Sequence, residues 1–293
     1  MTIFNLGSIN VDHFYSVPHL PRPGETLPAT AYTTGLGGKG ANQSVAAAHA
    51  GSNVVHIGAI GPDGAWTVDQ LRSAGVDCAH VVNVATPTAH AIINVAPDGE
   101  NVIVIFSGAN LEQSLSHLES AISAASRGDI LLLQNETNLQ VEAAEMARAQ
   151  GLFTIYSAAP FSAGAVQAIL PHIDLLVMNA VEADQLTKAL GTKLADLPVP
   201  HILITRGAQG STWNDQETGQ QISVPAFPVT PVDTTGAGDC FIGYVAAALE
   251  QGLVPPDALR LAAAASAIHV TRPGTADAIP TRAEVENFLA DHA

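Results

Sequence analysis

The chain contains, at residues 232–241, the segment Val232-Asp233-Thr234-Thr235-Gly236-Ala237-Gly238-Asp239-Cys240-Phe241, and an apolar run follows it. This apolar run predicts a helix that starts near the glycines. The backbone N–H groups of Gly236, Ala237 and Gly238 would then lie at the helix start, where free amides and the helix dipole bind anions. Asp239 at the edge of such a pocket could take a proton from an attacking hydroxyl, which suits phosphoryl transfer. Alternatively, Asp239 is an ordinary favourable acid of a first helical turn.

The composition describes a globular protein and excludes several classes of partner. The chain has 293 residues, of which 47% are hydrophobic and 13% charged, enough for one large α/β domain or two smaller ones. Lys and Arg number 11 against 27 Asp and Glu, for a net charge of −16. Nucleic acids and anionic membranes need a basic face, so neither is expected as a partner. Any phosphate site must therefore be built locally, from amides and a few cations.

The cysteines and the chain start indicate a cytoplasmic enzyme. Cys78 and Cys240 lie far apart in the sequence and are expected to be free thiols in a reducing compartment. The first residues lack the basic and apolar regions of a signal peptide, and no apolar run is long enough to span a membrane.

Apolar runs alternate with helix-compatible segments, which predicts a parallel sheet covered by helices on both faces. Strands are expected at 3–6, 11–17, 53–60, 89–95, 101–106, 130–133, 152–156, 175–178, 201–205, 212–214 and 221–224. Helices are expected at 41–50, 63–73, 115–125, 139–149, 181–189, 241–250 and 258–270. Two segments break the alternation, a Pro- and Gly-rich stretch near 18–35 and a hairpin near 87–107 around Asp98-Gly99. We expect them to form a small β excursion that could cover a substrate.

A second glycine loop, Leu36-Gly37-Gly38-Lys39-Gly40-Ala41-Asn42-Gln43, precedes the first expected helix. Gly38 and Gly40 let a ligand approach the backbone, Lys39 can meet negative charge, and Asn42 can bond a hydroxyl. Gly35, Gly37 and Gly40 also have the G-x-G-x-x-G spacing of a dinucleotide-binding site. However, the loop does not follow the first strand of a βαβ unit, and no acidic residue ends a second strand at the required offset. It is not a Walker loop either, because Gly40 follows the lysine.

Polar residues follow several expected strands, where ligands bind in α/β sheets. Asn10 and Asp12 could bond adjacent hydroxyls of a polyol, or simply form a turn. Asn179 and Glu182 have the spacing of a helix capping box, or could reach magnesium-bound water and phosphate. Glu136 and the Thr205-Arg206-Gly207 turn occupy similar strand-end positions.

Together these residues resemble the PfkB carbohydrate kinase family over nearly the whole chain, and within it the members that phosphorylate ribose. The resemblance is carried by six motifs: Gly7-Ser8-Ile9-Asn10-Val11-Asp12-His13, Pro23-Gly24-Glu25-Thr26, Gly37-Gly38-Lys39-Gly40-Ala41-Asn42-Gln43, Gly99-Glu100-Asn101-Val102-Ile103, Ser107-Gly108-Ala109-Asn110 and Asp233-Thr234-Thr235-Gly236-Ala237-Gly238-Asp239.

The resemblance implies a single domain over residues 1–293, with a three-layer α/β/α core and a mostly parallel sheet. It also implies a small β-sheet lid formed by about 11–35 and 87–107, a homodimer through the lid, and the use of ATP, Mg²⁺ and activating K⁺. The implied reaction is transfer of the ATP γ-phosphate to O5 of D-ribose. A kinase for another sugar or a nucleoside, and a catalytically silent sugar-binding protein, remain alternatives.

The resemblance also implies a role for each site residue. The implied catalytic group is Asp239 as general base, with Lys39 and the amides of Gly236, Ala237 and Gly238. The implied sugar contacts are Asn10, Asp12, Gly38, Lys39, Asn42, Ala91, Ile103, Glu136 and Asp239. The implied nucleotide contacts are Asn179, Glu182, Thr205, Arg206, Gly207, Gly210 and Gly238. Asn179 and Glu182 would serve Mg²⁺ through water, and the implied K⁺ loop is Asp233, Thr235, His269, Arg272, Gly274 and Ala278. His269 and Ala278 differ from the residues usual around that ion.

Overall fold

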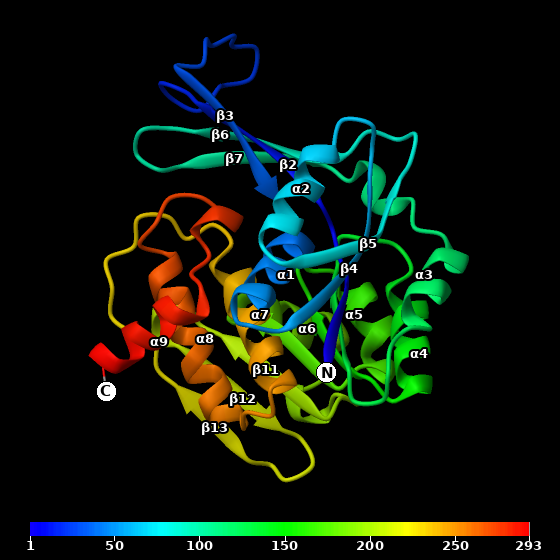
Figure 1. Ribbon diagram of the computed structural model, residues 1–293. Coiled ribbons are helices and arrows are strands. Elements are labelled where there is room, and N and C mark those ends of the chain that lie inside the picture. Colours follow the sequence, from blue (N-terminus) through cyan, green and yellow to red (C-terminus); the bar gives the residue numbers. More distant parts are fainter. Residues whose placement is uncertain (293) are drawn as a thin grey trace.

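The computed structural model describes residues 1–292, and strands and helices alternate along most of them (Figure 1). The strands are β1 (Thr2–Leu6), β2 (Asn10–Ser16), β3 (Ala31–Gly37), β4 (Asn53–Ile60), β5 (Val76–Asn83), β6 (Ala89–Val95), β7 (Asn101–Phe106), β8 (Ile130–Gln134), β9 (Phe153–Ser157), β10 (Leu175–Asn179), β11 (His201–Thr205), β12 (Ser211–Asp215) and β13 (Gln221–Val224). The α-helices are α1 (Lys39–His49), α2 (Ala65–Ser73), α3 (Leu115–Ile122), α4 (Gln140–Gln150), α5 (Ala163–Ile169), α6 (Ala180–Leu190), α7 (Ala237–Glu250), α8 (Pro255–His269) and α9 (Arg282–Asp291).

A nine-stranded sheet forms the centre of the molecule, in the order β13-β12-β11-β10-β9-β8-β1-β4-β5. All neighbouring strands in it are parallel except at one edge, where β12 is antiparallel to both β11 and β13. The parallel strands are apolar along their length because helices cover both faces. In β8, for example, Leu131, Leu132 and Leu133 are all fully buried.

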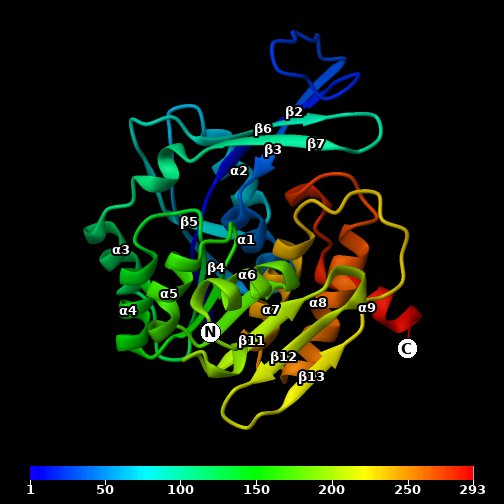
Figure 2. The same ribbon diagram turned by 180° about the vertical axis from the view of Figure 1, so that it is seen from behind.

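The helices divide into two layers, one on each face of the large sheet (Figures 1 and 2). Successive strand residues point to opposite faces, so Leu132 packs in the core under α1, α2, α7, α8 and α9, whereas Leu131 and Leu133 pack under α3 to α6. The expected three-layer α/β/α architecture is confirmed. None of the helices described for residues 1–292 is long and apolar enough to cross a membrane.

A separate four-stranded sheet, in the order β3-β2-β6-β7, stands at the carboxyl end of β1 (Figure 1). Strand β2 pairs antiparallel with β3 and parallel with β6, and β6 pairs antiparallel with β7 through the turn that contains Asp98-Gly99. Because β2 follows β1 after a short turn, this small sheet is carried over the carboxyl ends of the large sheet, where the polar residues were expected.

Some elements differ from the sequence-based expectation. Strands β3 and β5 and helices α5 and α9 were not predicted, and α1 and α8 begin at Lys39 and Pro255, earlier than expected. A proline is compatible with the first helical turn because the N–H that it lacks has no helical acceptor there. The last residue of the expected single domain, 293, lies outside the described residues.

Candidate active site

The two glycine loops precede two neighbouring helices, α1 and α7. Asp239 lies in the first turn of α7 and faces α1. Gly236 precedes α7 with a φ of 75°, a left-handed conformation that glycine adopts without strain, and Asp239 falls in the first turn of that helix. Its carboxylate accepts hydrogen bonds from Gln43 Nε2 at 2.9 Å and Asn42 Nδ2 at 3.3 Å, both from α1. Asp239 is 7% exposed, so it is buried beside the second glycine loop and keeps a small accessible surface.

Lys39 stands among several carboxylates. The negative charge of Asp239 is the largest cause that raises the pKa of Lys39, and Glu136, Glu182 and Asp12 add to it against the effect of burial. The Lys39 backbone N–H also donates to Glu136 Oε2 at 3.0 Å, and Ser8 Oγ donates to the same oxygen. Burial raises the pKa of Glu136, whereas the charge of Lys39 and these hydrogen bonds lower it. The lysine is therefore charged and near all four acids.

Asp12 reaches the same place from β2 of the small sheet. Burial, followed by the negative charges of Glu136 and Asp239, raises its pKa to about 7 against the lowering effect of Lys39. This carboxyl group is therefore partly protonated at neutral pH, whereas an exposed aspartate is fully ionised there. Asp12 is 7% exposed.

Two asparagines present unused hydrogen-bonding groups. Asn10 Oδ1 accepts from Asn110 Nδ2 at 2.9 Å, and Asn110 Oδ1 accepts from the Ile9 backbone N–H at 3.0 Å, so the side-chain amide of Asn10 remains as a donor. Asn42 Oδ1 is buried and has no partner among residues 1–292. Buried polar atoms in native proteins are normally paired, so Asn42 Oδ1 calls for a ligand donor. A donor, an acceptor and carboxylates side by side suit a molecule with several hydroxyl groups.

The small sheet carries the two apolar residues expected to contact the sugar, Ala91 and Ile103, and they differ in exposure. Asp12 lies opposite Ala91 in the β2–β6 pair, and Ile93 lies opposite Ile103 in the β6–β7 pair. Cross-strand partners share a face, so Ala91 and Ile103 are on the Asp12 face of the sheet. Ala91 is buried, whereas Ile103 is 47% exposed.

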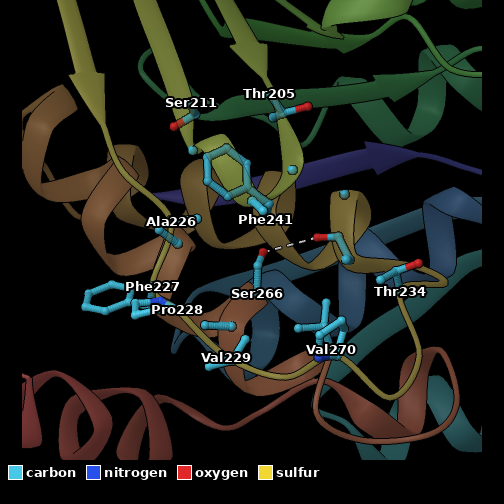
Figure 3. A pocket seen from close by; sticks show the side chains of 18 residues that line it. Thr205, Ser211, Ala226, Phe227, Pro228, Val229, Thr234, Phe241, Ser266 and Val270 are labelled. Atoms are coloured by element: carbon cyan, nitrogen blue, oxygen red, sulfur yellow. Dashed lines mark hydrogen bonds between the residues drawn. The ribbon is translucent and has the colours of Figure 1, made fainter.

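A cavity of about 560 Å³ lies on the other side of the α7 start (Figure 3). Thr205, Gly207, Gly210 and Gly238, all expected to contact a nucleotide, line it. The other lining residues are Ala208, Ser211, Ala226, Phe227, Pro228, Val229, Pro231, Thr234, Ala237, Phe241, Ala263, Ser266, Ala267 and Val270. This largely apolar lining suits a flat heterocyclic base, and Gly238 lies where the cavity meets the helix start.

Three expected nucleotide contacts, Arg206, Asn179 and Glu182, do not line the cavity, and one expected anion-binding amide is already bonded within the protein. Arg206 does not line the cavity, because its Nη1 atom donates to Thr212 Oγ1 at 2.7 Å. The Ala237 N–H, expected to bind an anion, donates to the Thr234 carbonyl at 3.2 Å, and the Ala237 carbonyl accepts from Ser266 Oγ (Figure 3). Gly238 belongs to the first turn, whose amides lack helical acceptors. The anion pocket at the start of α7 therefore depends chiefly on the backbone amides of Gly236 and Gly238, which flank Ala237.

Asn179 and Glu182 form the capping box that their spacing predicted. Asn179 Oδ1 accepts from the Glu182 N–H at 2.9 Å, and Glu182 Oε2 accepts from the Asn179 N–H at 2.7 Å. Burial raises the pKa of Glu182, and the charge of Lys39 lowers it. The pair therefore caps α6 and also lies within electrostatic reach of Lys39.

The loop expected to hold K⁺ is closed by hydrogen bonds. Asp233 accepts from the Thr235 N–H at 2.9 Å and from the Gly274 N–H at 3.1 Å. The fully buried His269 contacts the Thr235 carbonyl through Nε2 at 2.8 Å, and burial lowers its pKa. A carbonyl can only accept, so His269 Nε2 carries the proton. Ala278 is buried in the 3₁₀ turn Ala276–Ala278, and the Arg272 guanidinium bonds Glu284 instead of entering the loop.

Three residues with a clear place in this site were not singled out from the sequence. Asn110 orients Asn10, Gln43 bonds Asp239, and Gln134 bonds Gln43. Gln43 and Asn110 belong to motifs quoted above, which was the available signal. Gln134 directly follows the expected strand 130–133 and is the last residue of β8, where a polar residue is unusual because the strand is covered on both faces.

Known proteins resemble this chain along almost its entire length. Residues 2–282 match the pfkB family carbohydrate kinases. The chain is 37% identical to a ribokinase of Haemophilus influenzae, over 100% of this chain and 99% of the other, and 32% identical to a deoxyribokinase of Salmonella typhi, over 99% of both. It superposes on the structure of Arabidopsis thaliana ribokinase complexed with ribose and ATP with a TM-score of 0.86, at 30% identity and 98% coverage of both chains. The match along almost the entire chain, with both glycine loops in place, identifies the protein as a member of the pfkB family of carbohydrate kinases.

Proposed function

We propose that the protein transfers the γ-phosphate of ATP to O5 of D-ribose. The observation that carries the proposal is the position of Asp239, which lies between the apolar cavity and the polar cluster of Asn10, Asp12 and Asn42. Relatives named ribokinase and a neighbour bound to ribose and ATP support the choice of substrates. In this proposal ATP binds in the apolar cavity, and the sugar binds in the polar cluster.

In the proposed reaction each group acts at a defined atom. Asp239 accepts the proton of the attacking sugar hydroxyl as the hydroxyl oxygen bonds the γ-phosphorus, while the bond from that phosphorus to the bridging oxygen breaks and ADP leaves. The amides at the start of α7 and the ammonium group of Lys39 stabilise the negative charge of the transferring group. Asn10, Asp12, Asn42 and Glu136 hold the other hydroxyls, so the acceptor hydroxyl keeps one position. The small sheet would act as a lid that excludes water, which otherwise competes as acceptor.

Mg²⁺ suits the carboxylates around Lys39. Among residues 1–292 no group of three His, Cys, Asp or Glu side chains is arranged as a metal site. Carboxylates nevertheless surround Lys39 and outnumber it, and magnesium commonly binds through few protein ligands, several waters and the substrate phosphates. When bound, Mg²⁺ would neutralise phosphate charge. Glu182 and Asn179 would orient its water ligands.

K⁺ remains part of the proposal as an activating ion at the loop that the resemblance implies. Oxygens of Asp233 accept from the Thr235 and Gly274 N–H groups, and the Thr235 carbonyl accepts from His269 Nε2. Carboxylate and carbonyl oxygens have further lone pairs, so these bonds leave acceptors for a cation. The His269 N–H would compete with K⁺ for the Thr235 carbonyl.

We also propose a homodimer through the lid and a cytoplasmic location. The lid face away from Asp12 exposes Tyr32, Ile92, Val102, Val104 and Phe106, with exposed fractions of 38% to 61%. The β2–β3 and β6–β7 registers put these residues on one face, opposite the sugar-facing side. Exposed apolar faces of this kind commonly mark protein–protein contacts, and the lid of a second copy of the chain would cover this one. Both cysteines are buried and unpaired, which suits a reducing compartment.

A coupled assay of ADP release across a panel of acceptors tests the proposed function. D-Ribose should stimulate ADP release most strongly, and omission of sugar should reduce it to background. The panel includes 2-deoxy-D-ribose because a deoxyribokinase is among the relatives. It also includes D-fructose and adenosine for the broader family. A higher kcat/KM for another acceptor would make that acceptor the proposed substrate in place of ribose. If no acceptor stimulates ADP release, the result would support a catalytically silent sugar-binding protein.

A further inference from the structure

Asp239 is the end of a continuous chain of hydrogen-bonded side chains that lies inside the protein between α1 and the large sheet. The other members are all fully buried. They are Gln43, Gln134, Asn5, Ser44 and His56, and we call this set the buried polar chain. Burying amides and hydroxyls is unfavourable unless each is hydrogen-bonded, and apolar residues could fill the same space. The buried polar chain therefore needs an explanation beyond packing.

The backbone fixes the direction of these hydrogen bonds. Asn5 Nδ2 donates to the Gly40 carbonyl at 2.8 Å, and a carbonyl can only accept. Asn5 Oδ1 must then accept, and Gln134 Nε2 donates to it at 2.9 Å. The second N–H of Gln134 donates to Gln43 Oε1, also at 2.9 Å. Gln43 therefore has only its Nε2 group to offer to Asp239 Oδ1, at 2.9 Å.

The far end of the buried polar chain is fixed in the same way. Asn5 Nδ2 also donates to Ser44 Oγ at 2.8 Å, so Ser44 gives its own proton to His56 Nδ1 at 2.8 Å. His56 Nε2 then donates to the Gly7 carbonyl at 3.1 Å. Burial lowers the pKa of His56 to about 4, which keeps the imidazole neutral, as one acceptor and one donor require.

The position of Gln134 indicates that its two donors matter. Its Oε1 atom is buried without a partner among the described residues, which costs folding free energy. Turning the amide over would place oxygen against the oxygens of Asn5 and Gln43. The residue is thus held in the one orientation that sends an N–H toward Gln43, and through it toward Asp239.

We propose that the buried polar chain positions the catalytic base and that Gln43 is the positioning residue, an inference that rests on the proposed function. The Gln43 N–H donates to Asp239 Oδ1. This bond and the one from Asn42 hold the carboxyl group in one rotamer, with Oδ2 toward Asn42 and the sugar compartment. Because a misplacement of about 1 Å at a reacting group can cost roughly 100-fold in rate, this orientation affects turnover more than sugar binding.

Two substitutions of Gln43 and one control test the inference by steady-state kinetics with the best acceptor from the panel. Gln43→Met keeps the side-chain length and removes the donor; kcat should fall roughly 10- to 100-fold with the sugar KM within about threefold. Gln43→Glu keeps the shape but places a second carboxyl against Asp239. The pair would share a proton, so the acid limb of the pH–kcat profile should move to higher pH. The control is Thr154→Val, which alters a fully buried hydroxyl outside the buried polar chain.

The outcomes separate positioning from general stabilisation. The inference is overturned if Gln43→Met has the kcat of Thr154→Val, or if Gln43→Glu leaves the pH–kcat profile unchanged. Gln43→Glu remains informative if the methionine variant does not fold. If the unmodified protein phosphorylates no acceptor, the proposed function fails, and a crystal structure of Gln43→Met still decides the inference. A rotated Asp239 carboxylate supports positioning by Gln43, and an unmoved one contradicts it.

Discussion

The replacement of Asp12 by Asn should change the pH dependence of folding in a direction that the structure specifies. The folded pKa of Asp12 is about 7, against 3.8 for an unperturbed aspartate. The folded protein therefore binds more protons than the unfolded chain between these two values. A folded pKa above the unfolded one contributes stability that is fully present below about pH 4 and is lost as the pH rises through 7.

The magnitude follows from the size of the pKa shift. One pKa unit corresponds to about 1.4 kcal/mol, so the whole effect is about 4 kcal/mol, lost at about 1.4 kcal/mol per pH unit. Between pH 5.5 and 7 the wild-type protein should lose about 2 kcal/mol relative to Asp12→Asn, which cannot titrate at this position. For a chain of this length that difference corresponds to about 3 °C in Tm.

Urea unfolding without ligands at pH 5.5, 6.25 and 7 measures the effect. The quantity to compare is the wild-type free energy of unfolding minus that of Asp12→Asn, which should decrease as the pH rises. Thr154→Val is the control, because it changes a buried polar group without removing a titratable one, and its difference from wild type should not vary with pH. Parallel curves for wild type and Asp12→Asn would refute the buried, charge-crowded environment inferred for Asp12.

Three further substitutions test other parts of the account. In Gly40→Ala the new Cβ would lie 2.3 Å from Gly7 Cα and from Ser8 N, so unfolding in urea should show a loss of roughly 1–3 kcal/mol; Gly164→Ala, with open space around it, should be nearly neutral. His269→Ala removes the donor to the Thr235 carbonyl, so K⁺ should stimulate initial rates more in this variant than in wild type; equal stimulation would contradict the role given to the imidazole. Val104→Glu should convert the proposed dimer to a monomer by light scattering, whereas Val254→Glu, also exposed but away from the lid, should not; a dimer that survives Val104→Glu would exclude this lid face.

The large sheet was predictable because its strands are buried on both faces. Strands with continuous apolar runs, such as residues 130–133 and 175–178, stand out from any amphipathic pattern. Strand β3 could not be found in this way, because its sequence Ala31-Tyr32-Thr33-Thr34-Gly35-Leu36-Gly37 mixes polar residues and glycines. Its pairing with β2 defines it, and pairing depends on the tertiary fold.

The site was predictable as a set of residues and not as a network. The glycine motifs indicated Asp239 and Lys39, since helix-opening glycines are local signals. The bond from Gln43 to Asp239 joins residues 196 positions apart, and no local pattern reports such a contact. The pKa of Asp12 likewise depends first on its burial and then on how closely Glu136 and Asp239 approach it, which only the assembled fold determines.

The central claim is that Asp239 is the general base for phosphoryl transfer to the sugar. Asp239→Asn keeps the shape of the side chain and an oxygen to accept from Gln43, but it removes the proton acceptor. Measured with ribose and ATP, kcat should fall by roughly 10²- to 10⁴-fold, while the ribose Kd from calorimetry stays within about threefold of wild type. A variant that turns over at nearly the wild-type rate would contradict the assignment of Asp239 and the mechanism built on it.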